Sequence, residues 1–163
     1  MQRKYWIIGI IFAFFLGLDQ ASKCLIERFF FVHESREVIP GFFNITYVLN
    51  KGAAFGLFGT LPGAATLFVI IALIAIALIL MYIRQIQARE VWAPVCFALI
   101  LTGAAGNLFD RFRLGSVVDF LDFYYLGWHW PAFNVADTCI TIGVTLLAIR
   151  ILLDGGKTIK ENN

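Results

Sequence analysis

Two aspartates in this sequence lie in surroundings that rarely hold a charged side chain. Asp119 is enclosed by the largely apolar residues 116–121, and Asp137 is followed by the apolar segment 138–144. A carboxyl group in such a setting is costly unless it is neutral or paired, so its presence indicates a function. If the two carboxyls face each other away from water, one retains a proton. Such a pair supplies a general base together with a general acid.

Further polar residues lie where apolar segments begin or end. Asn107, Asp110 and Arg111 are spaced i, i+3 and i+4, which places the first and the last two near one another on a helix. Asn134 lies three residues before Asp137 and would share its helix face. We interpret Asp110 and Arg111 as a structural ion pair.

Other interpretations of the polar residues are open. Asp122 competes with Asp119 for a catalytic role, because both lie in the same connection between apolar segments. A metal site formed by Asp119, Asp122, Asp137 and His129 is an alternative, although the sequence has no HExxH or comparable ligand spacing. A Ser-His-Asp triad has less support, since Ser116 has no G-x-S-x-G setting. The three cysteines are far apart in apolar sequence, which favours packing roles.

The elements that must position these residues are membrane-spanning helices. Of the 163 residues, 60% are hydrophobic and 15% are charged, and the mean hydropathy is +0.81. Soluble domains contain about 45–50% apolar and about 25% charged residues. The uncharged runs predict a single domain with four transmembrane helices over about residues 5–28, 62–83, 91–109 and 131–150. Because the fourth helix is predicted to begin near residue 131, Asp137 would lie beyond its first turn. The attraction of acids to a helix N-terminus no longer acts there.

The first span is the least regular of the four. Its uncharged part, Tyr5 to Leu18, is shorter than the roughly 20 residues that cross a bilayer. The helix is therefore expected to continue, with Asp19 and Lys23 paired at i and i+4. Basic residues before an apolar stretch also resemble a secretory signal peptide. No A-x-A-like cleavage site follows, and Lys23 stands where a lipoprotein cleavage box needs a small residue, so we expect the span to be retained.

The segment between the first two spans, about residues 37–59, predicts β-structure outside the membrane. Residues 42–49 are largely aromatic and β-branched, and turn residues bound them on both sides. These aromatics, with Trp128 and Trp130, are typical of a membrane interface. The fold class is therefore a membrane all-α protein with a small extramembrane β element.

Four spans place both termini on one side of the membrane. Basic residues are divided almost evenly between the two sides, whereas acidic residues gather on the side opposite the termini. We expect both termini to be cytoplasmic and the chemistry to lie on the acidic, outer side. The net charge of +2 and the lack of basic runs argue against binding to nucleic acid.

Five motifs, in order, resemble those of the bacterial lipoprotein signal peptidases, which are also called signal peptidase II. They cover nearly the whole chain and read Asp19-Gln20-x-Ser22-Lys23, Asn50-x-Gly52-Ala53-Ala54-Phe55-Gly56, Gly103-Ala104-Ala105-Gly106-Asn107-x-x-Asp110-Arg111, Val117-Val118-Asp119-Phe120 and Phe133-Asn134-x-Ala136-Asp137. Each motif alone is weak, but five in order within a four-span frame are specific. The family often has two glycines where this chain has Gly103-Ala104, and alanine still permits close helix packing.

The resemblance implies an aspartyl endopeptidase that cuts prolipoproteins before a cysteine carrying diacylglycerol, without a metal or another cofactor. It assigns catalysis to Asp119 and Asp137 and removes Asp122 from the candidates. The supporting residues that it implies are Asp19, Lys23, Asn50, Gly52, Asn107, Arg111 and Asn134. The expected location is the bacterial cytoplasmic (inner) membrane, with the active site near the outer face. Prolipoproteins and membrane lipids are the expected partners of a monomer.

Two other classes of function are open on the residues alone. Transporters and proton relays also contain intramembrane aspartates, but these acids would be distributed through the bilayer, whereas the middles of the last three spans are uncharged. A structural or assembly subunit would use asparagine and aspartate only to join helices. Such a subunit would tolerate conservative substitution of Asp119 and Asp137.

Overall fold

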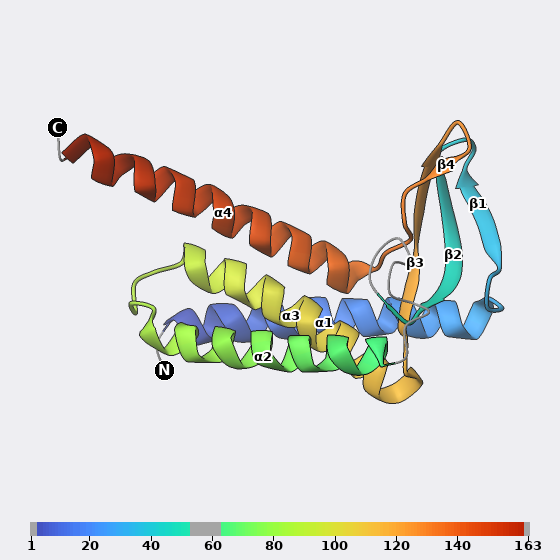
Figure 1. Ribbon diagram of the computed structural model, residues 1–163, viewed down its shortest axis with the longest axis horizontal. Coiled ribbons are helices and arrows are strands. Elements are labelled where there is room, and N and C mark those ends of the chain that lie inside the picture. The colour runs from blue at the N-terminus through green and yellow to red at the C-terminus, as the bar shows by residue number, and fades with distance from the viewer. Residues whose placement is uncertain (1–2, 53–62, 162–163) are drawn as a thin grey trace.

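Four long helices and a four-stranded sheet make up the described part of the chain, residues 3–52 and 63–161 of a computed structural model. The elements are, in order, α1 (Arg3–Phe29), β1 (Ser35–Ile39), β2 (Phe43–Asn50), α2 (Ala64–Gln85), α3 (Trp92–Leu114), β3 (Val117–Tyr125), β4 (Trp128–His129) and α4 (Val135–Glu161). The sheet lies at one end of the helices, and the start of α1 and the end of α4 lie at the other (Figure 1). Residues 53–59 of the predicted β segment lie outside the described residues.

The prediction of four spans is confirmed, because the described residues contain four helices that are long and apolar enough to cross a membrane. α1 continues through Asp19 and Lys23 to Phe29, as expected. Large apolar side chains such as Ile10 and Leu78 are exposed on the outside of the helices, as a multi-pass membrane protein in contact with lipid requires.

α3 is the central helix. In the apolar 18-residue stretch of α3, 67% is buried inside the protein, whereas the corresponding share is 11% for α1 and α2 and 17% for α4. Glycines allow this close packing: a Cβ on Gly103 would lie 2.2 Å from the carbonyl oxygen of Ala136, and one on Gly143 would lie 2.8 Å from that of Cys96. The backbones of α3 and α4 therefore touch at both positions, as small residues permit in lipid.

The sheet is antiparallel, and its strands are ordered β1-β2-β3-β4. β3 lies in a segment that the sequence pattern does not predict as a strand, because aspartates interrupt its β-branched and aromatic residues. Gly115, with φ of 69°, adopts the left-handed conformation that ends α3 and turns the chain into β3. A register shift in the pairing of β2 with β3, between Ile45 and Val48, places Val48 opposite Asp119.

The sheet is held against the helices by a small apolar cluster. Ile26 near the end of α1 packs with Tyr47 of β2 and with Val118 and Phe120 of β3. Val118 is completely buried, so β3 cannot shift without opening this contact. The cluster thereby fixes Asp119, the residue between Val118 and Phe120, at the ends of the helices.

Candidate active site

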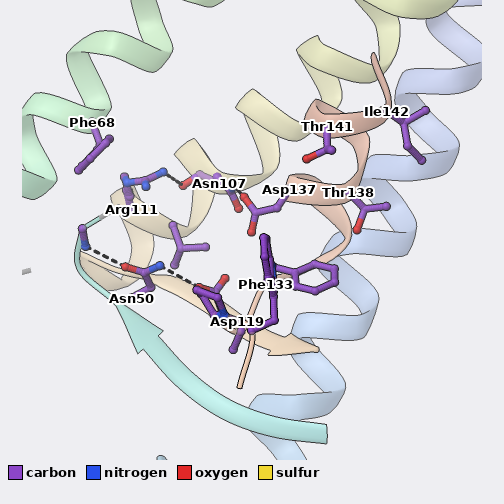
Figure 2. Close-up of a pocket in the computed structure, with 15 residues that line it drawn as sticks. Asn50, Phe68, Asn107, Arg111, Asp119, Phe133, Asp137, Thr138, Thr141 and Ile142 are labelled. Carbon is purple, nitrogen blue, oxygen red and sulfur yellow. Dashed lines mark hydrogen bonds between the residues drawn. The ribbon is translucent and has the colours of Figure 1, made fainter. Parts of the chain in front are cut away.

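A cavity of about 470 Å³ lies where the sheet meets the ends of the helices. Asp119 reaches it from β3, and Asp137 reaches it from the first turn of α4 (Figure 2). Of the other residues predicted for the site, those that line the cavity are Asn50, Gly52, Asn107 and Arg111. An apolar wall completes the cavity and includes Phe68, Trp130, Pro131, Phe133 and Ile142.

Asp119 is almost completely buried, with 2% of its surface exposed. Its Oδ2 accepts a hydrogen bond from Asn50 Nδ2 at 2.9 Å, and its Oδ1 accepts one from Asn134 Nδ2 at 2.7 Å. Burial, and after it the negative charge of Asp137, raise the pKa of Asp119 to about 7, although the two amides oppose the shift. This carboxyl is therefore able to hold and release a proton near neutral pH.

Asp137 occupies the third position of α4 and forms a reciprocal cap with Asn134. Asp137 N donates to Asn134 Oδ1 at 2.9 Å, and Asn134 N donates to Asp137 Oδ2 at 3.3 Å. The prediction that Asp137 lies beyond the first turn is wrong, because this cap starts the helix at Val135 rather than near residue 131. Capping alone does not account for Asp137, since its Oδ1 lies at the cavity and accepts a hydrogen bond from Asn107 Nδ2 at 2.7 Å.

Two asparagines connect the aspartates. The Nδ2 group of Asn134 lies 2.7 Å from Asp119 Oδ1 and 3.2 Å from Asn107 Oδ1. Asn107 in turn donates to Asp137. Asn134 is fully buried and Asn107 is 7% exposed, so water does not compete for these bonds. The chain of amides fixes the two carboxyl groups relative to each other.

Lys23 is the centre of a buried charge cluster behind the asparagines. Its Nζ lies 2.9 Å from Asp19 Oδ2, 2.9 Å from Asp110 Oδ2 and 3.1 Å from Asn107 Oδ1. The three donors of the ammonium group are thus all used. The prediction that Asp19 pairs with Lys23 is confirmed. Asp19 Oδ1 also accepts the backbone N–H of Ala136 at 2.9 Å, which ties α1 to the first turn of α4.

Arg111 does not pair with Asp110, contrary to the sequence-based interpretation. Neighbouring residues of a helix point in different directions, and Asp110 turns toward Lys23 instead. The Arg111 guanidinium lies 5.3 Å from the centre of the Phe68 ring and donates to the carbonyl of Asn107 at 3.2 Å. Its buried Nε has no hydrogen-bond partner among the described residues. A positive group therefore lies at the cavity wall (Figure 2).

The sequence model of one peptidase family, A8, described as Signal peptidase (SPase) II, matches residues 11–153. The chain belongs to the signal peptidase II family. The lipoprotein signal peptidase of Geobacter metallireducens is 43% identical over 99% of this chain and 100% of its own length. That of Syntrophus aciditrophicus is 45% identical over 93% of this chain and 96% of its own.

A solved structure has a similar fold. It is described as a bacterial membrane enzyme, and it matches with a TM-score of 0.82 and 38% identity over 92% of this chain and 90% of its own. As a member of this family the chain is an aspartic peptidase, and its four long apolar helices make it a multi-pass membrane protein. The family match and the sequences of the relatives confirm the resemblance that the five motifs indicate.

Three predicted site residues do not line the cavity, namely Asn134, Asp19 and Lys23. Asn134 acts on the site by donating to Asp119, and Asp19 and Lys23 act behind the cavity, through Ala136 and Asn107. Conversely, the sequence pattern does not identify Phe68, which reaches the site from α2. Nothing in the apolar run of α2 distinguishes Phe68 from its neighbours, so only the packing of the helices reveals its position.

The four residues considered as metal ligands do not lie together at one site. His129 Nδ1 lies 2.9 Å from Asp122 Oδ1, but neither residue lines the cavity that contains Asp119 and Asp137. Asp119 and Asp122 are three residues apart on one strand, so their side chains point to opposite faces. Within residues 3–52 and 63–161, no group of three or more histidine, cysteine or acidic side chains is placed to hold a metal ion.

Proposed function

We propose that this protein removes the signal peptides of diacylglyceryl-modified prolipoproteins, and that Asp119 and Asp137 are its catalytic pair. The observation that carries the proposal is the presence of two largely buried carboxyl groups at one cavity, each held by asparagine amides. Two carboxyls that share a proton are able to hydrolyse a peptide bond by activating water. The name of the relatives, lipoprotein signal peptidase, supports the substrate class.

In this proposal Asp137 is ionised and acts as the base, whereas Asp119 is protonated and acts as the acid. A pKa of about 7 allows Asp119 to hold its proton in neutral solution. Asp137 lies in the first turn of α4, where the positive end of the helix dipole favours a carboxylate. One amide and one backbone N–H also donate to Asp137.

The reaction then proceeds in two steps, formation and breakdown of a diol, with two proton transfers in each step. A water molecule between the carboxyls gives a proton to Asp137 while its oxygen bonds to the scissile carbonyl carbon. Asp119 gives its proton to the carbonyl oxygen, which produces a neutral diol. The C–N bond breaks as Asp137 passes its proton to the leaving nitrogen, and Asp119 recovers a proton from a hydroxyl of the diol. Both carboxyls return to their starting charge.

The remaining residues of the cavity would hold the substrate and the pair. The Nε of Arg111, which has no hydrogen-bond partner among the described residues, is available to a carbonyl or another acceptor of the bound peptide. Gly52 N donates to Asn50 Oδ1 at 2.9 Å, and this bond turns the amide of Asn50 toward Asp119. Gly52 thus supports the site through its backbone.

We place the active site near the outer face of the bacterial cytoplasmic membrane and both termini in the cytoplasm. The cavity is lined by residues of β2, β3 and the start of α4. These elements meet at the sheet end of the helices, away from the start of α1 and the end of α4 (Figure 1). A substrate held by acyl chains cannot leave the bilayer, so its scissile bond stays near the interface. The exposed Trp128 and Trp130 at this end suit such a location.

Cleavage of a purified lipid-modified prolipoprotein by the full-length protein in detergent micelles tests the proposal. Asp119→Asn and Asp137→Asn are each expected to lower kcat by roughly 1,000-fold, because each removes a proton-transfer group. Glu27→Gln is the matched control, since Glu27 is a carboxylate of α1 that lies outside the cavity. Asp122→Asn tests the competing assignment and is expected to keep most of kcat.

Thermal unfolding of each variant separates lost chemistry from lost folding. Substantial cleavage by either folded variant of the catalytic pair would refute the mechanism. A chelator is expected to have no effect on the wild-type protein. A loss of activity with the chelator that added metal restores would instead favour a metal site.

A further inference from the structure

A second aspartate of β3 forms a side-chain pair that the proposed chemistry does not use. Asp122 is 8% exposed, and its Oδ1 and Oδ2 lie 2.9 Å and 3.0 Å from His129 Nδ1. Asn44 Nδ2 also donates to Asp122 Oδ2, at 2.9 Å. An ionised carboxylate only accepts hydrogen bonds, so His129 Nδ1 carries a proton. The pair therefore consists of a nearly buried acceptor and a donor on the next strand.

The strand that carries His129 is short. β4 contains two residues, and its backbone pairs only with the last two residues of β3, Tyr124 and Tyr125. The turn before it includes Leu126 at φ of 49°, a conformation that non-glycine residues rarely adopt. So short a ladder gives little stability by itself. The side chain of His129 supplies the further contacts, namely the bond to Asp122 and a stack on the Tyr124 ring, with 4.9 Å between ring centres.

The same stack joins His129 to the other edge of the sheet. The hydroxyl of Tyr124 donates to Glu37 and accepts the backbone N–H of Gly41 at 2.9 Å. Side chains from β1, β2 and β3 thus combine to hold His129 in place. Contacts on the sheet face opposite Asp119 thereby hold the side chain of His129, and with it β4.

The chain that leaves β4 becomes a wall of the cavity. Residues 130–133 line the cavity, and Asn134, which binds Asp119, follows them directly. The backbone of this segment bonds to β3: Trp130 N donates to the carbonyl of Phe123 at 2.8 Å, and Phe133 N donates to that of Leu121 at 3.1 Å. His129 is therefore the last residue anchored by its side chain to the sheet before the wall begins.

We propose that Asp122 and His129 are positioning residues for peptide hydrolysis, which hold the wall formed by residues 130–133 where it receives the substrate. The inference rests on the proposed function, because it assigns the wall to the bound prolipoprotein. Neither residue lines the cavity, so the pair acts on substrate binding through the wall and leaves the proton transfers of Asp119 and Asp137 in place. Loss of the pair should raise KM rather than lower kcat.

A double-mutant cycle on KM tests whether the two residues act through each other. With lipid-modified prolipoprotein as substrate, Asp122→Ala and His129→Ala are each expected to raise KM roughly tenfold, with kcat changed less than about threefold. The double variant is expected to raise KM by the same factor of about ten, because either single change already breaks the pair. Arg113→Ala is the control, since it breaks an exposed ion pair with Glu27 that does not contact the wall.

A second pair of variants distinguishes the hydrogen bond from the packing of the ring. Nδ1 of histidine and Nδ2 of asparagine are both bonded to Cγ, so His129→Asn keeps a donor where Asp122 needs it. His129→Gln places its amide farther out, near the position of Nε2, and both variants lose the stack on Tyr124. His129→Asn is therefore expected to have a KM near that of the wild-type protein, whereas His129→Gln should resemble His129→Ala.

Each outcome decides the inference. Three outcomes would overturn it if the wild-type protein still cleaves its substrate. They are an unchanged KM in the folded alanine variants, additive effects on KM in the double variant, and an equal KM for His129→Asn and His129→Gln. If the alanine variants do not fold, the comparison of asparagine with glutamine decides alone. Failure of the proposed function is distinct, because the wild-type protein would then not cleave the lipid-modified substrate, and this inference would fall with it.

Discussion

The contact between α3 and α4 at Gly103 provides a direct test of how the site is positioned. In Gly103→Ala, the added Cβ would lie 2.2 Å from the carbonyl oxygen of Ala136 and 2.5 Å from Ile140 Cγ1, whereas ordinary contacts are 3.4–4 Å. The first clash is with backbone, which cannot rotate away. The helices must therefore separate locally by about 1 Å, since repulsion rises steeply below the contact distance.

This separation would move the first turn of α4, which contains Asp137. The hydrogen bond from Asn107 Nδ2 to Asp137 Oδ1, now 2.7 Å, would lengthen beyond the range of a hydrogen bond. A catalytic group misplaced by about 1 Å costs roughly 100-fold in rate. We expect kcat of Gly103→Ala to fall by about this factor, and the free energy of unfolding to fall by about 1–3 kcal/mol through overpacking.

The assay is cleavage of lipid-modified prolipoprotein, with thermal unfolding measured on the same samples. Gly143→Ala is the first control, because its Cβ would meet Cys96 O at 2.8 Å and strain the same two helices farther along α4 from Asp137. It should lose stability but less of kcat. Gly17→Ala meets nothing within 4 Å, so it should keep the wild-type kcat and lose no stability. Wild-type kcat in folded Gly103→Ala, or an equal loss in Gly143→Ala, would refute the reasoning.

Two further predictions concern the acid of the pair and the far end of the helices. Because Asp119 must be protonated and its pKa in the free protein is about 7, kcat/KM should fall as the pH rises through about 7. Asn50→Ala removes a hydrogen bond that favours the carboxylate, so the pKa should rise and this alkaline limb of the pH–rate profile should move to higher pH. An unmoved limb would contradict the role of Asp119 as acid. Lys4→Met should lower the free energy of unfolding by about 2 kcal/mol, because Lys4 Nζ donates to carbonyls at the end of α2, including that of Ile83 at 3.0 Å. This end of α2 is remote from the sheet, so kcat should be unchanged. Thermal unfolding in detergent checks this, and an unchanged midpoint would show that the contact contributes little.

Local patterns in the sequence determine the membrane frame and the principal candidates of the site. The length of an uncharged run decides whether a helix crosses a bilayer, and i, i+4 spacing decides that Asp19 meets Lys23. Neither property depends on the rest of the fold. Asp119 and Asp137 stand out for the same kind of reason, because a carboxyl in apolar sequence needs an explanation wherever the chain folds. Their catalytic role remains a prediction.

Other features depend on contacts between distant parts of the chain, and only the tertiary structure decides them. β3 exists as a strand because β2 pairs with it, and the strand sends Asp119 to the cavity and Asp122 to the opposite face. The partner of Asp110 is Lys23 of another helix rather than its neighbour Arg111. These choices follow from packing: a buried charge takes the partner that the fold brings within hydrogen-bond distance, and spacing along the chain does not encode that distance.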